Sequence, residues 1–277
     1  MPTIAVTGAG GFIGSRIVRR FADRGWRALA LVRDPSAPLP PGVDAVAYDL
    51  TAAPPQLPEV DWLVHAAYAP GDERVNAAGT RRLMEATRAQ GVGRALFMSS
   101  IAARPGTIYT YGRQKLESER LFQAVLRPGL VIGDGGLLQR TVRWMRRRRV
   151  VPLVAGGTQP LQTVSVDDLV TAVERVVDGD LSGLYTVADP RATTYRDVYS
   201  AMAHALGLHV LFVPVPLRVL EFALRAAEAS RIPLGVGPDN LRGLSSARHV
   251  DTRPDLERLG LRLEPLEESL RRLLAAG

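Results

Sequence analysis

The segment Thr7-Gly8-Ala9-Gly10-Gly11-Phe12-Ile13-Gly14 decides the fold of this chain. It follows a β-branched run at Thr3 to Thr7 and opens an amphipathic helical pattern over Phe12 to Asp23. Glycines with this spacing between a strand and a helix are typical of a dinucleotide site. They allow a tight turn, close approach of main-chain amides to a pyrophosphate, and close packing of the helix on the strand. The predicted cofactor contacts in this turn are Gly8, Gly11, Phe12, Ile13 and Gly14.

Short β-rich runs alternate with helical patterns through the first half of the chain. Proline-rich stretches at Pro35 to Pro41 and Ala52 to Pro58 separate the strands, because proline lacks the donor that a sheet needs. This alternation predicts a doubly wound, parallel α/β sheet of the Rossmann type, and we assign residues 1–132 to a dinucleotide-binding domain. The expected elements are Thr3 to Thr7, Phe12 to Asp23, Arg27 to Val32, Val43 to Tyr48, Asp61 to His65, Glu73 to Gln90 and Ala95 to Ser99.

The pattern becomes less regular in the second half, and we assign residues 133–277 to a smaller substrate lobe. Two β-like segments, Leu161 to Val166 and Gly183 to Val187, suggest that part of residues 161–190 packs back on the Rossmann sheet. The expected helices of this half are Val166 to Val177, Tyr195 to Ala205, Leu217 to Ala229 and Pro265 to Ala275.

The composition is that of a globular protein with a large core. The chain has 277 residues, 46% of them hydrophobic, with a formal net charge of +7 and no cysteine. The missing cysteines exclude disulfides and thiolate chemistry, and the four histidines lack metal-ligand spacing, so no metal site is predicted. No apolar stretch approaches the roughly 18 to 20 residues of a membrane helix, and the chain opens on a strand. We therefore expect a cytoplasmic protein without a membrane partner.

The densest positive charge lies in a run of arginines, Arg146 to Arg149, at the end of an expected helix over Gly135 to Val150. Arginines at this end of a helix interact favourably with its dipole. Aromatic platforms for stacking bases are nearly absent around the run, and Trp144 stands alone. The run is therefore interpreted as a solvated helix end, and no nucleic-acid partner is predicted.

The end of the second strand bears on the choice of cofactor. Arg33 is the first residue after the β-rich run Arg27 to Val32, and Asp34 follows it. An acidic residue at this place usually binds a ribose diol, whereas an arginine can pair with a 2′-phosphate in a fork geometry. Because Arg33 comes first, we predict NADP in preference to NAD, although a shift of one residue would put the Asp34 carboxylate there instead.

Two further segments follow strands of the predicted sheet and should lie at the same edge as the dinucleotide. Asp49 and Leu50 come after the third strand, while Ala66 and Ala67 come after the fourth. Small residues at the second place would let the cofactor approach the main chain. We predict cofactor contacts at all four residues and interpret His65 as a packed strand residue.

A pair of residues farther along suggests the chemistry. Tyr111 and Lys115 stand four residues apart on one face of an expected helix, downstream of Ser99 and Ser100. A free tyrosine has a pKa near 10, and a nearby lysine favours its phenolate, so that Tyr111 can act as a general acid or base. Lys115 can also bind the cofactor ribose, and a serine hydroxyl can polarise the substrate oxygen.

With these motifs the chain closely resembles the extended branch of the short-chain dehydrogenase/reductase superfamily, which includes nucleotide-sugar epimerases and dehydratases that depend on NAD. The resemblance spans most of the chain. The motifs that carry it are Thr7 to Gly14, Asn76-Ala77-Ala78-Gly79-Thr80, Phe97-Met98-Ser99-Ser100, Tyr111-Gly-Arg-Gln-Lys115, Leu126-Arg127-Pro128-Gly129 and Val164-Ser165-Val166-Asp167-Asp168-Leu169.

The resemblance implies catalytic roles for Ser100, Tyr111 and Lys115, with Ser99 as the alternative hydroxyl. It also implies a structural role for Asn76, and a homodimer formed through helices around Glu73 to Gln90 and Tyr111 to Val125.

Departures from the family pattern bear on the reaction. The stretch Ser100-Ile101-Ala102 replaces the Thr-Asp-Glu that carries elimination in the dehydratases, so dehydration is disfavoured. The segment Ile101 to Thr110 is short for a sugar epimerase. After Gly156-Gly157-Thr158-Gln159 the chain continues Pro160-Leu161-Gln162, without the arginine that often meets a nucleotide diphosphate.

The leading hypothesis is thus an NADP-preferring oxidoreductase that exchanges hydride with the carbonyl or secondary alcohol of a small molecule through Ser100, Tyr111 and Lys115. One alternative is a nucleotide-sugar epimerase with tightly held NAD. Another is a cofactor-binding regulatory or assembly protein that does no chemistry.

Overall fold

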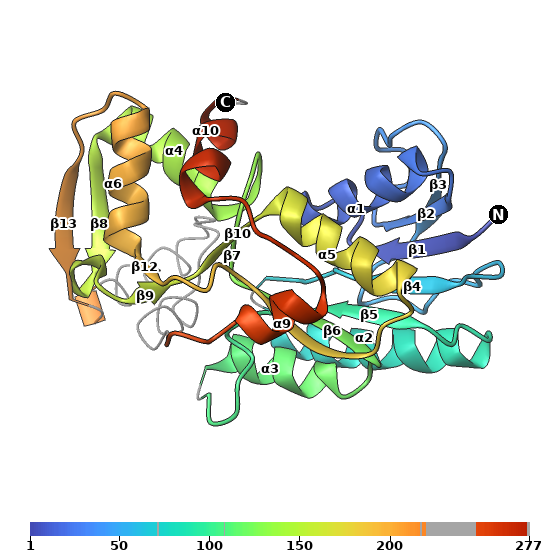
Figure 1. Cartoon of the computed structure of the whole chain (residues 1–277). Helices are drawn as coiled ribbons and strands as arrows, with labels where there is room; N and C mark the ends of the chain where they lie inside the picture. Colours follow the sequence, from blue (N-terminus) through green and yellow to red (C-terminus); the bar gives the residue numbers. More distant parts are fainter. Residues whose placement is uncertain (71, 108, 217, 220–247, 276–277) are drawn as a thin grey trace.

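The architecture is a Rossmann-type half joined to a smaller lobe, which lie side by side in Figure 1. The computed structural model describes residues 1–70, 72–107, 109–216, 218–219 and 248–275. The predicted helix Leu217 to Ala229 lies almost wholly outside the described residues.

The main sheet has seven strands in the order β11-β6-β5-β4-β1-β2-β3, and every pairing in it is parallel. The strand order reverses direction beside β1, where a doubly wound sheet leaves a crevice at the carboxyl ends of its strands. The strands are β1 (Thr3–Thr7), β2 (Arg27–Val32), β3 (Val43–Ala47), β4 (Trp62–His65), β5 (Ala95–Met98), β6 (Ala124–Pro128) and β11 (Gly183–Val187).

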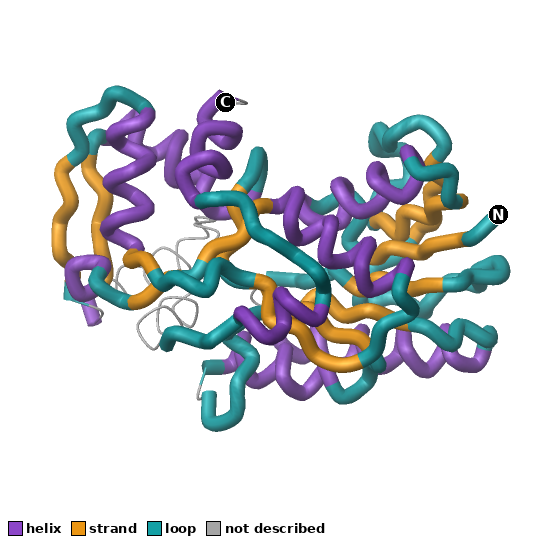
Figure 2. The backbone as a smooth tube through the Cα atoms, viewed as in Figure 1, coloured by secondary structure: helices purple, strands orange, loops and turns teal. Residues whose placement is uncertain are grey.

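Helices cover both faces of this sheet (Figures 1 and 2). On one face α1 (Phe12–Asp23) and α5 (Val166–Asp178) bury apolar stripes that include Phe21 and Val173. On the other face lie α2 (Glu73–Ala89) and α3 (Thr110–Glu119), with Leu83 of α2 in the core. These layers make the strands apolar on both sides, as parallel strands generally are.

The smaller lobe has a core of its own, which includes Leu138, Met145 and Leu270. Its elements are β7 (Leu130–Ile132), α4 (Gly136–Arg148), β8 (Val150–Val154), a 3-10 turn (Ala155–Gly157), β9 (Pro160–Leu161), β10 (Thr163–Ser165), β12 (Thr193–Thr194), α6 (Tyr195–Ala205), β13 (Leu211–Val215) and α10 (Leu266–Ala275). The helix α9 (Arg253–Arg258) returns to the main sheet, where its Leu256 joins the core beside β11.

The two β-like segments predicted for the second half have different places. Gly183–Val187 forms the edge strand β11 beside β6. The segment 160–165 does not enter the main sheet, because β9 pairs with β12 and β10 pairs with β7 in separate two-stranded sheets. The helix α5 connects the two regions by packing on the main sheet immediately after β10.

Gly79 of α2 packs closely against the loop after β3, and replacing this glycine tests that packing. A Cβ on Gly79 would overlap the Leu50 carbonyl oxygen, whereas nothing lies within 4 Å of a Cβ on Gly93. We expect Gly79→Ala to lower the free energy of unfolding by about 1 to 2 kcal/mol, since the clash exceeds the gain in helix propensity of up to about 1 kcal/mol. Urea unfolding of both variants checks this, with Gly93→Ala as the control. Equal stability of the two would contradict the packing described.

Candidate active site

The glycine turn after β1 brings the main chain of two strand ends into contact. Gly8 has φ +68, and a Cβ there would lie 2.8 Å from the Cα atom and nitrogen of Ala67 and 2.9 Å from the carbonyl carbon of Ala66. A Cβ on Gly14 would overlap the Gly8 carbonyl oxygen, which accepts a hydrogen bond of 2.8 Å from the Gly11 amide. The turn therefore requires glycine at Gly8 and Gly14.

The start of α1 offers main-chain donors at the crevice. Gly11 is the residue before the helix, and the first turn carries no acidic side chain. The positive end of a helix of this kind attracts an anion such as a pyrophosphate. Ile13 lines a pocket there, as its predicted contact with a cofactor requires.

Phe12 has a different environment from the one predicted. Its ring packs against Gly133, Gly135 and Gly136 in the loop between β7 and α4, where any Cβ would come within 3.1 Å or less of the ring. A contact of Phe12 with a dinucleotide would therefore be made by its main chain. The sequence signal for this packing is the run Gly133-Asp134-Gly135-Gly136, but nothing in that run points to Phe12.

The acidic residues that follow β2 and β3 are engaged in their own turns. The Asp34 carboxylate accepts hydrogen bonds from the Ser36 amide (2.9 Å) and hydroxyl (2.6 Å), and the side-chain bond is the main cause of its lowered pKa. The Asp49 carboxylate is bound in the same way by Thr51, which lowers its pKa, and the charge of Arg33 lowers it further. Arg33 is therefore near Asp49, and Arg33 is exposed to solvent while Asp49 is partly exposed.

Leu50 and the alanines lie inward of these charges. Leu50 is buried, and its carbonyl oxygen accepts a hydrogen bond of 2.6 Å from Arg82. The Ala67 amide donates to the Thr7 hydroxyl at 3.2 Å, which holds the end of β4 against the glycine turn.

A pocket of about 190 Å³ brings together the predicted catalytic residues Ser100, Tyr111 and Lys115 with Ile13 and Ala66 of the predicted cofactor site. The walls also include side chains that the sequence did not indicate, namely Tyr68, Met98, Pro128 and Val131. The predicted residues Arg33, Asp49 and Leu50 do not line this pocket, since they lie at the ends of β2 and β3.

Tyr111 and Ser100 are joined by a hydrogen bond between their side chains. Burial raises the pKa of Tyr111, and the bond to Ser100 opposes that change. The Tyr111 ring packs edge-on against Tyr68, with ring centroids 5.3 Å apart. A phenol in this setting holds its proton at neutral pH, which fits a proton donor.

Lys115 is buried beside this pair. Its Nζ donates a hydrogen bond of 2.8 Å to the Met98 carbonyl oxygen and lies 4.6 Å from the Phe97 ring centroid and 5.3 Å from that of Tyr68. Burial lowers the pKa of Lys115 to about 8, and the charge of Glu119 opposes the change. In the chain without a cofactor, burial and Ser100 are what shift the pKa of Tyr111, and the expected effect of Lys115 on that pKa stays a prediction.

The structure distinguishes the two serines at the end of β5. The Ser99 hydroxyl donates to the Glu119 carboxylate at 2.5 Å and is buried, so it is committed to α3. The Ser100 hydroxyl bonds Tyr111 and accepts a hydrogen bond of 3.2 Å from the Ala102 amide. Ser100 is thus the hydroxyl that faces the pocket beside the phenol.

Comparison with protein-family models gives one match, to the NAD dependent epimerase/dehydratase family over residues 4–187. The chain belongs to this family. The family match confirms the predicted resemblance to the extended short-chain dehydrogenase/reductase branch, and with the structural likenesses below it confirms the predicted Rossmann fold.

Two relatives are similar to this chain over most of its length. The ceramide reductase of Caulobacter vibrioides (strain NA1000 / CB15N) is 29% identical over 234 residues, which cover 77% of this chain and 73% of that protein. The uncharacterized protein y4nG of Sinorhizobium fredii (strain NBRC 101917 / NGR234) is 25% identical over 271 residues, which cover 85% of this chain and 67% of that protein.

Solved structures of nucleotide-sugar enzymes share the fold. MoeE5 in complex with UDP-glucose and NAD has a TM-score of 0.77 and 24% identity, with 99% of this chain and 97% of that chain covered. UDP-galactose 4-epimerase has a TM-score of 0.76 and 19% identity, with 99% of each chain covered.

This chain has a single lysine. Of its 35 lysine and arginine residues, only Lys115 is a lysine. An arginine stays charged at any physiological pH, whereas a lysine can lose its proton when it is buried. The sequence therefore held a stronger signal for Lys115 than the Tyr-x-x-x-Lys spacing alone.

Two polar residues near the site, His65 and Asn76, use their side chains for hydrogen bonds within the fold. His65 is fully buried, bonded to the hydroxyls of Thr7 (2.7 Å) and Thr80 (2.9 Å), and stacked on Phe97. The side-chain oxygen of Asn76 accepts a hydrogen bond of 2.8 Å from the Ala69 amide, and its side-chain nitrogen donates one of 2.7 Å to the Ala69 carbonyl oxygen. These bonds connect α2 to the loop after β4.

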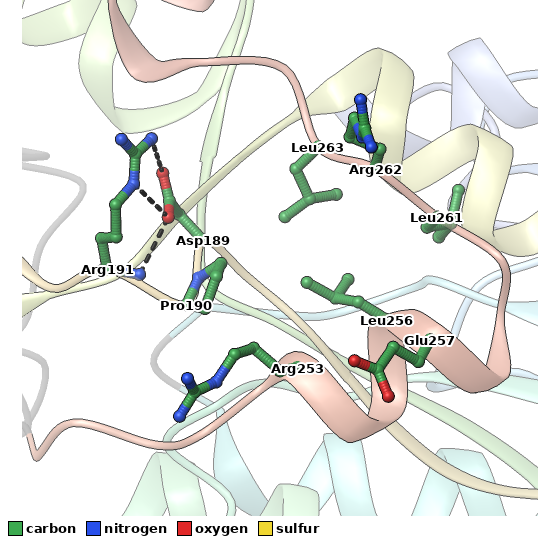
Figure 3. Close-up of a pocket in the computed structure, with 9 residues that line it drawn as sticks. All are labelled: Asp189, Pro190, Arg191, Arg253, Leu256, Glu257, Leu261, Arg262 and Leu263. Carbon is green, nitrogen blue, oxygen red and sulfur yellow. Dashed lines mark hydrogen bonds and ion pairs between the residues drawn. The ribbon is translucent and has the colours of Figure 1, made fainter.

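A larger cavity of about 290 Å³ lies at the sheet edge between the end of β11 and α9 (Figure 3). Its arginines are Arg191, Arg253 and Arg262, around a floor that includes Leu256. Arg191 pairs with Asp189 of the same wall at 3.1 Å, while Arg253 pairs with the neighbouring Asp251. None of the predicted site residues lines this cavity, and we do not take it as the active site.

The described residues contain neither a cluster of metal ligands nor a helix that could span a membrane. No group of three or more histidine, aspartate or glutamate side chains there is arranged to hold a metal ion. Within the same ranges, no helix has the length and apolar character needed to cross a membrane.

The burial of His65 predicts a specific acid sensitivity. Burial, followed by the charge of Lys115, lowers the pKa of His65 to about 3 from an unfolded value near 6.5. The unfolded state therefore takes up a proton that the folded state refuses, and stability falls as pH drops from about 6.5 toward about 3. We expect a loss approaching about 1.4 kcal/mol per pH unit, measured by urea unfolding between pH 6.5 and 4.5.

His65→Gln should flatten that slope, even if it lowers stability overall. The exposed His204 provides the matched control, since His204→Gln should leave the slope unchanged. An equal slope in wild type and His65→Gln would contradict the assignment.

Proposed function

We propose that this chain is an NADP-preferring oxidoreductase that transfers hydride between the cofactor and a carbonyl or secondary alcohol. The observation that carries the proposal is the convergence of Ser100, Tyr111 and Lys115 on one pocket, to which Ile13 at the start of α1 also contributes. Membership of an NAD-dependent family supports a nicotinamide cofactor.

The glycine turn fits such a cofactor. Gly8 and Gly14 leave no side chain between the main chain and the crevice, and Phe12 and Ile13 present main-chain amides at the positive end of α1, next to Gly11. When bound, the cofactor supplies or accepts the hydride.

Two hydroxyl groups handle the substrate oxygen in this proposal. Ser100 donates a hydrogen bond that polarises the carbonyl, and Tyr111 gives its phenolic proton to that oxygen as negative charge develops there. Oxidation of an alcohol runs the same transfer backwards. Because burial raises the pKa of Tyr111, the phenol holds its proton at neutral pH and is available as the proton donor when a carbonyl is reduced.

Lys115 supports both the cofactor and the phenol. An ammonium has three donors, and the bond to the Met98 carbonyl uses one of them. The other two can bind the cofactor ribose and the Tyr111 oxygen. With a pKa of about 8, Lys115 is cationic at neutral pH and can stabilise a phenolate after the proton has left.

The NADP preference rests on the charges after β2. Arg33 is exposed and can pair with a 2′-phosphate, while the Asp34 carboxylate is occupied by Ser36. Asp49, which lies near Arg33, is likewise occupied by Thr51. These bonds leave the guanidinium as the group best able to recognise the ribose substituent.

The pocket walls favour a substrate of low polarity. Tyr68, Met98, Pro128 and Val131 surround the reacting groups, and no carboxylate lines the pocket in the described part of the chain. The Caulobacter relative is named for the reduction of a lipid, ceramide, which agrees with a reductase that accepts an apolar carbonyl compound.

A nucleotide-sugar epimerase is the second candidate, supported by the fold shared with UDP-galactose 4-epimerase. It would hold NAD through purification and show no net cofactor turnover. A non-catalytic, cofactor-binding protein is the third, and the test of Tyr111 below separates it from both enzymes.

Two properties stay predictions from the sequence. We propose a homodimer formed through α2 and α3, as the family resemblance implies, and a cytoplasmic location.

Replacing the phenol tests the catalytic role. We expect Tyr111→Phe to lower turnover of NADPH with a panel of apolar ketones by about 10²-fold to 10⁴-fold, because the proton donor is lost. Tyr109→Phe, two residues earlier, is the control and should keep wild-type turnover. Equal rates for Tyr111→Phe and wild type would support the non-catalytic alternative, and loss of UDP-galactose epimerisation without NADPH turnover would support the epimerase.

Replacing Arg33 tests the choice of cofactor. Arg33→Ala should weaken NADP binding relative to NAD by about 1 to 3 kcal/mol, the range for a hydrogen bond to a charged group, as measured by calorimetric titration of both dinucleotides. The exposed Arg19 on α1 offers a control, since Arg19→Ala also removes one positive charge. An unchanged NADP to NAD ratio in Arg33→Ala would remove this residue from the site.

A further inference from the structure

One face of α3 is bonded to the end of β5 at three successive turns. Tyr111 bonds the Ser100 side chain, Lys115 donates to the Met98 carbonyl, and Glu119 accepts from the Ser99 hydroxyl. These helix residues are spaced by four, so they lie along a single stripe. The proposed mechanism uses the first two contacts and leaves the third without a role.

Glu119 is held more firmly than a surface carboxylate. Its side chain is 8% exposed, and one of its oxygens accepts from both Ser99 (2.5 Å) and Nε of Arg127 (2.8 Å). Its other oxygen accepts from Nη2 of Arg127 at 2.6 Å, and the Arg127 side chain is 16% exposed. A bidentate pair of this kind fixes the carboxylate in place.

The charge of Glu119 acts on Lys115 from one turn away. Burial lowers the pKa of Lys115, and Glu119 is the charged group that opposes the change. The other titratable groups around the ammonium are Tyr111 on the same helix, Tyr68 after β4 and His65 on β4, whose pKa of about 3 leaves it neutral. Arg127 on β6 lies behind Glu119 and weakens its field without removing it.

We propose that Glu119 is a positioning residue for Lys115: held between Ser99 and Arg127, its carboxylate keeps a fixed negative charge behind the ammonium and so keeps Lys115 cationic inside the pocket. The inference rests on the proposed function for the task of Lys115. The arrangement of charges does not depend on turnover, so it can be tested separately.

The single lysine makes a direct measurement possible. Protein labelled with ¹⁵N in lysine carries its only labelled side-chain amine at Lys115, and NMR titration of that amine reports its protonation without substrate or cofactor. We expect the pKa of Lys115 to fall by about one unit in Glu119→Gln, since Glu119 raises that pKa through its charge and a nearby opposite charge typically shifts a pKa by about one to three units. Glutamine keeps the size of the side chain and can still bond Ser99 and Arg127.

Two further variants give the measurement a control and a change of opposite sign. Glu117 lies on the same helix but is exposed and pairs with Arg81, so Glu117→Gln should leave the pKa of Lys115 unchanged. Arg127→Met removes the cation behind Glu119, and the pKa of Lys115 should rise. If either Glu119→Gln or Arg127→Met fails to fold, the other decides the sign.

The outcomes separate this inference from the proposed function. A pKa that falls in Glu119→Gln supports the inference even if no ketone is ever reduced. Equal Lys115 pKa values in Glu119→Gln and Glu117→Gln would overturn it while leaving Ser100 and Tyr111 untouched. Failure of both Glu119→Gln and Arg127→Met to fold would also overturn it, because the pair would then serve the fold alone.

Discussion

Close approach of main chain to main chain at the ends of β1 and β4 is the constraint on which the rest of this structure depends. Gly8 leaves no room for a Cβ against Ala66 and Ala67, and Gly14 leaves none against Gly8 itself. These contacts bring the start of α1 to the crevice where the strand order reverses. Because every strand of the main sheet is parallel, the end of β5 arrives at the same edge with Ser100. The tight turn thus forms the proposed cofactor site, and the parallel sheet brings Ser100 to the same edge.

The electrostatics of the site follow from placing a single lysine where water is excluded. Burial lowers the pKa of Lys115 to about 8, within reach of neutral pH, which an arginine in that position would not allow. The same burial raises the pKa of Tyr111, so the two pKa values move apart and the ammonium becomes the more acidic of the two groups. Both groups still hold their protons at neutral pH, and Lys115 is the one whose titration lies nearer to neutral pH.

The sequence was sufficient for the features that depend on local pattern. Strand and helix periodicity gave β1, α1 and α6 with their observed ends, and glycine spacing gave the turn between β1 and α1. The spacing of Tyr111 and Lys115 predicted a shared helix face, and both residues line one pocket. Contacts between segments that are distant in the chain could not be predicted from local sequence pattern. The packing of Phe12 on the glycines of 133–136, and the pairing of β10 with β7, depend on how the lobe folds back.

The same limit applies to Glu119, whose environment cannot be predicted from the sequence. Read as one of two glutamates on a helix, it is indistinguishable from Glu117, and surface exposure is the ordinary expectation for both. Only the fold places Arg127 of β6 and Ser99 of β5 on either side of one of them. A carboxylate buried with a guanidinium is expensive to desolvate, and replacing such a pair with apolar residues is often harmless to stability. Its presence one helical turn from the only lysine is therefore better explained by the charge it gives to the pocket than by the stability it gives to the fold.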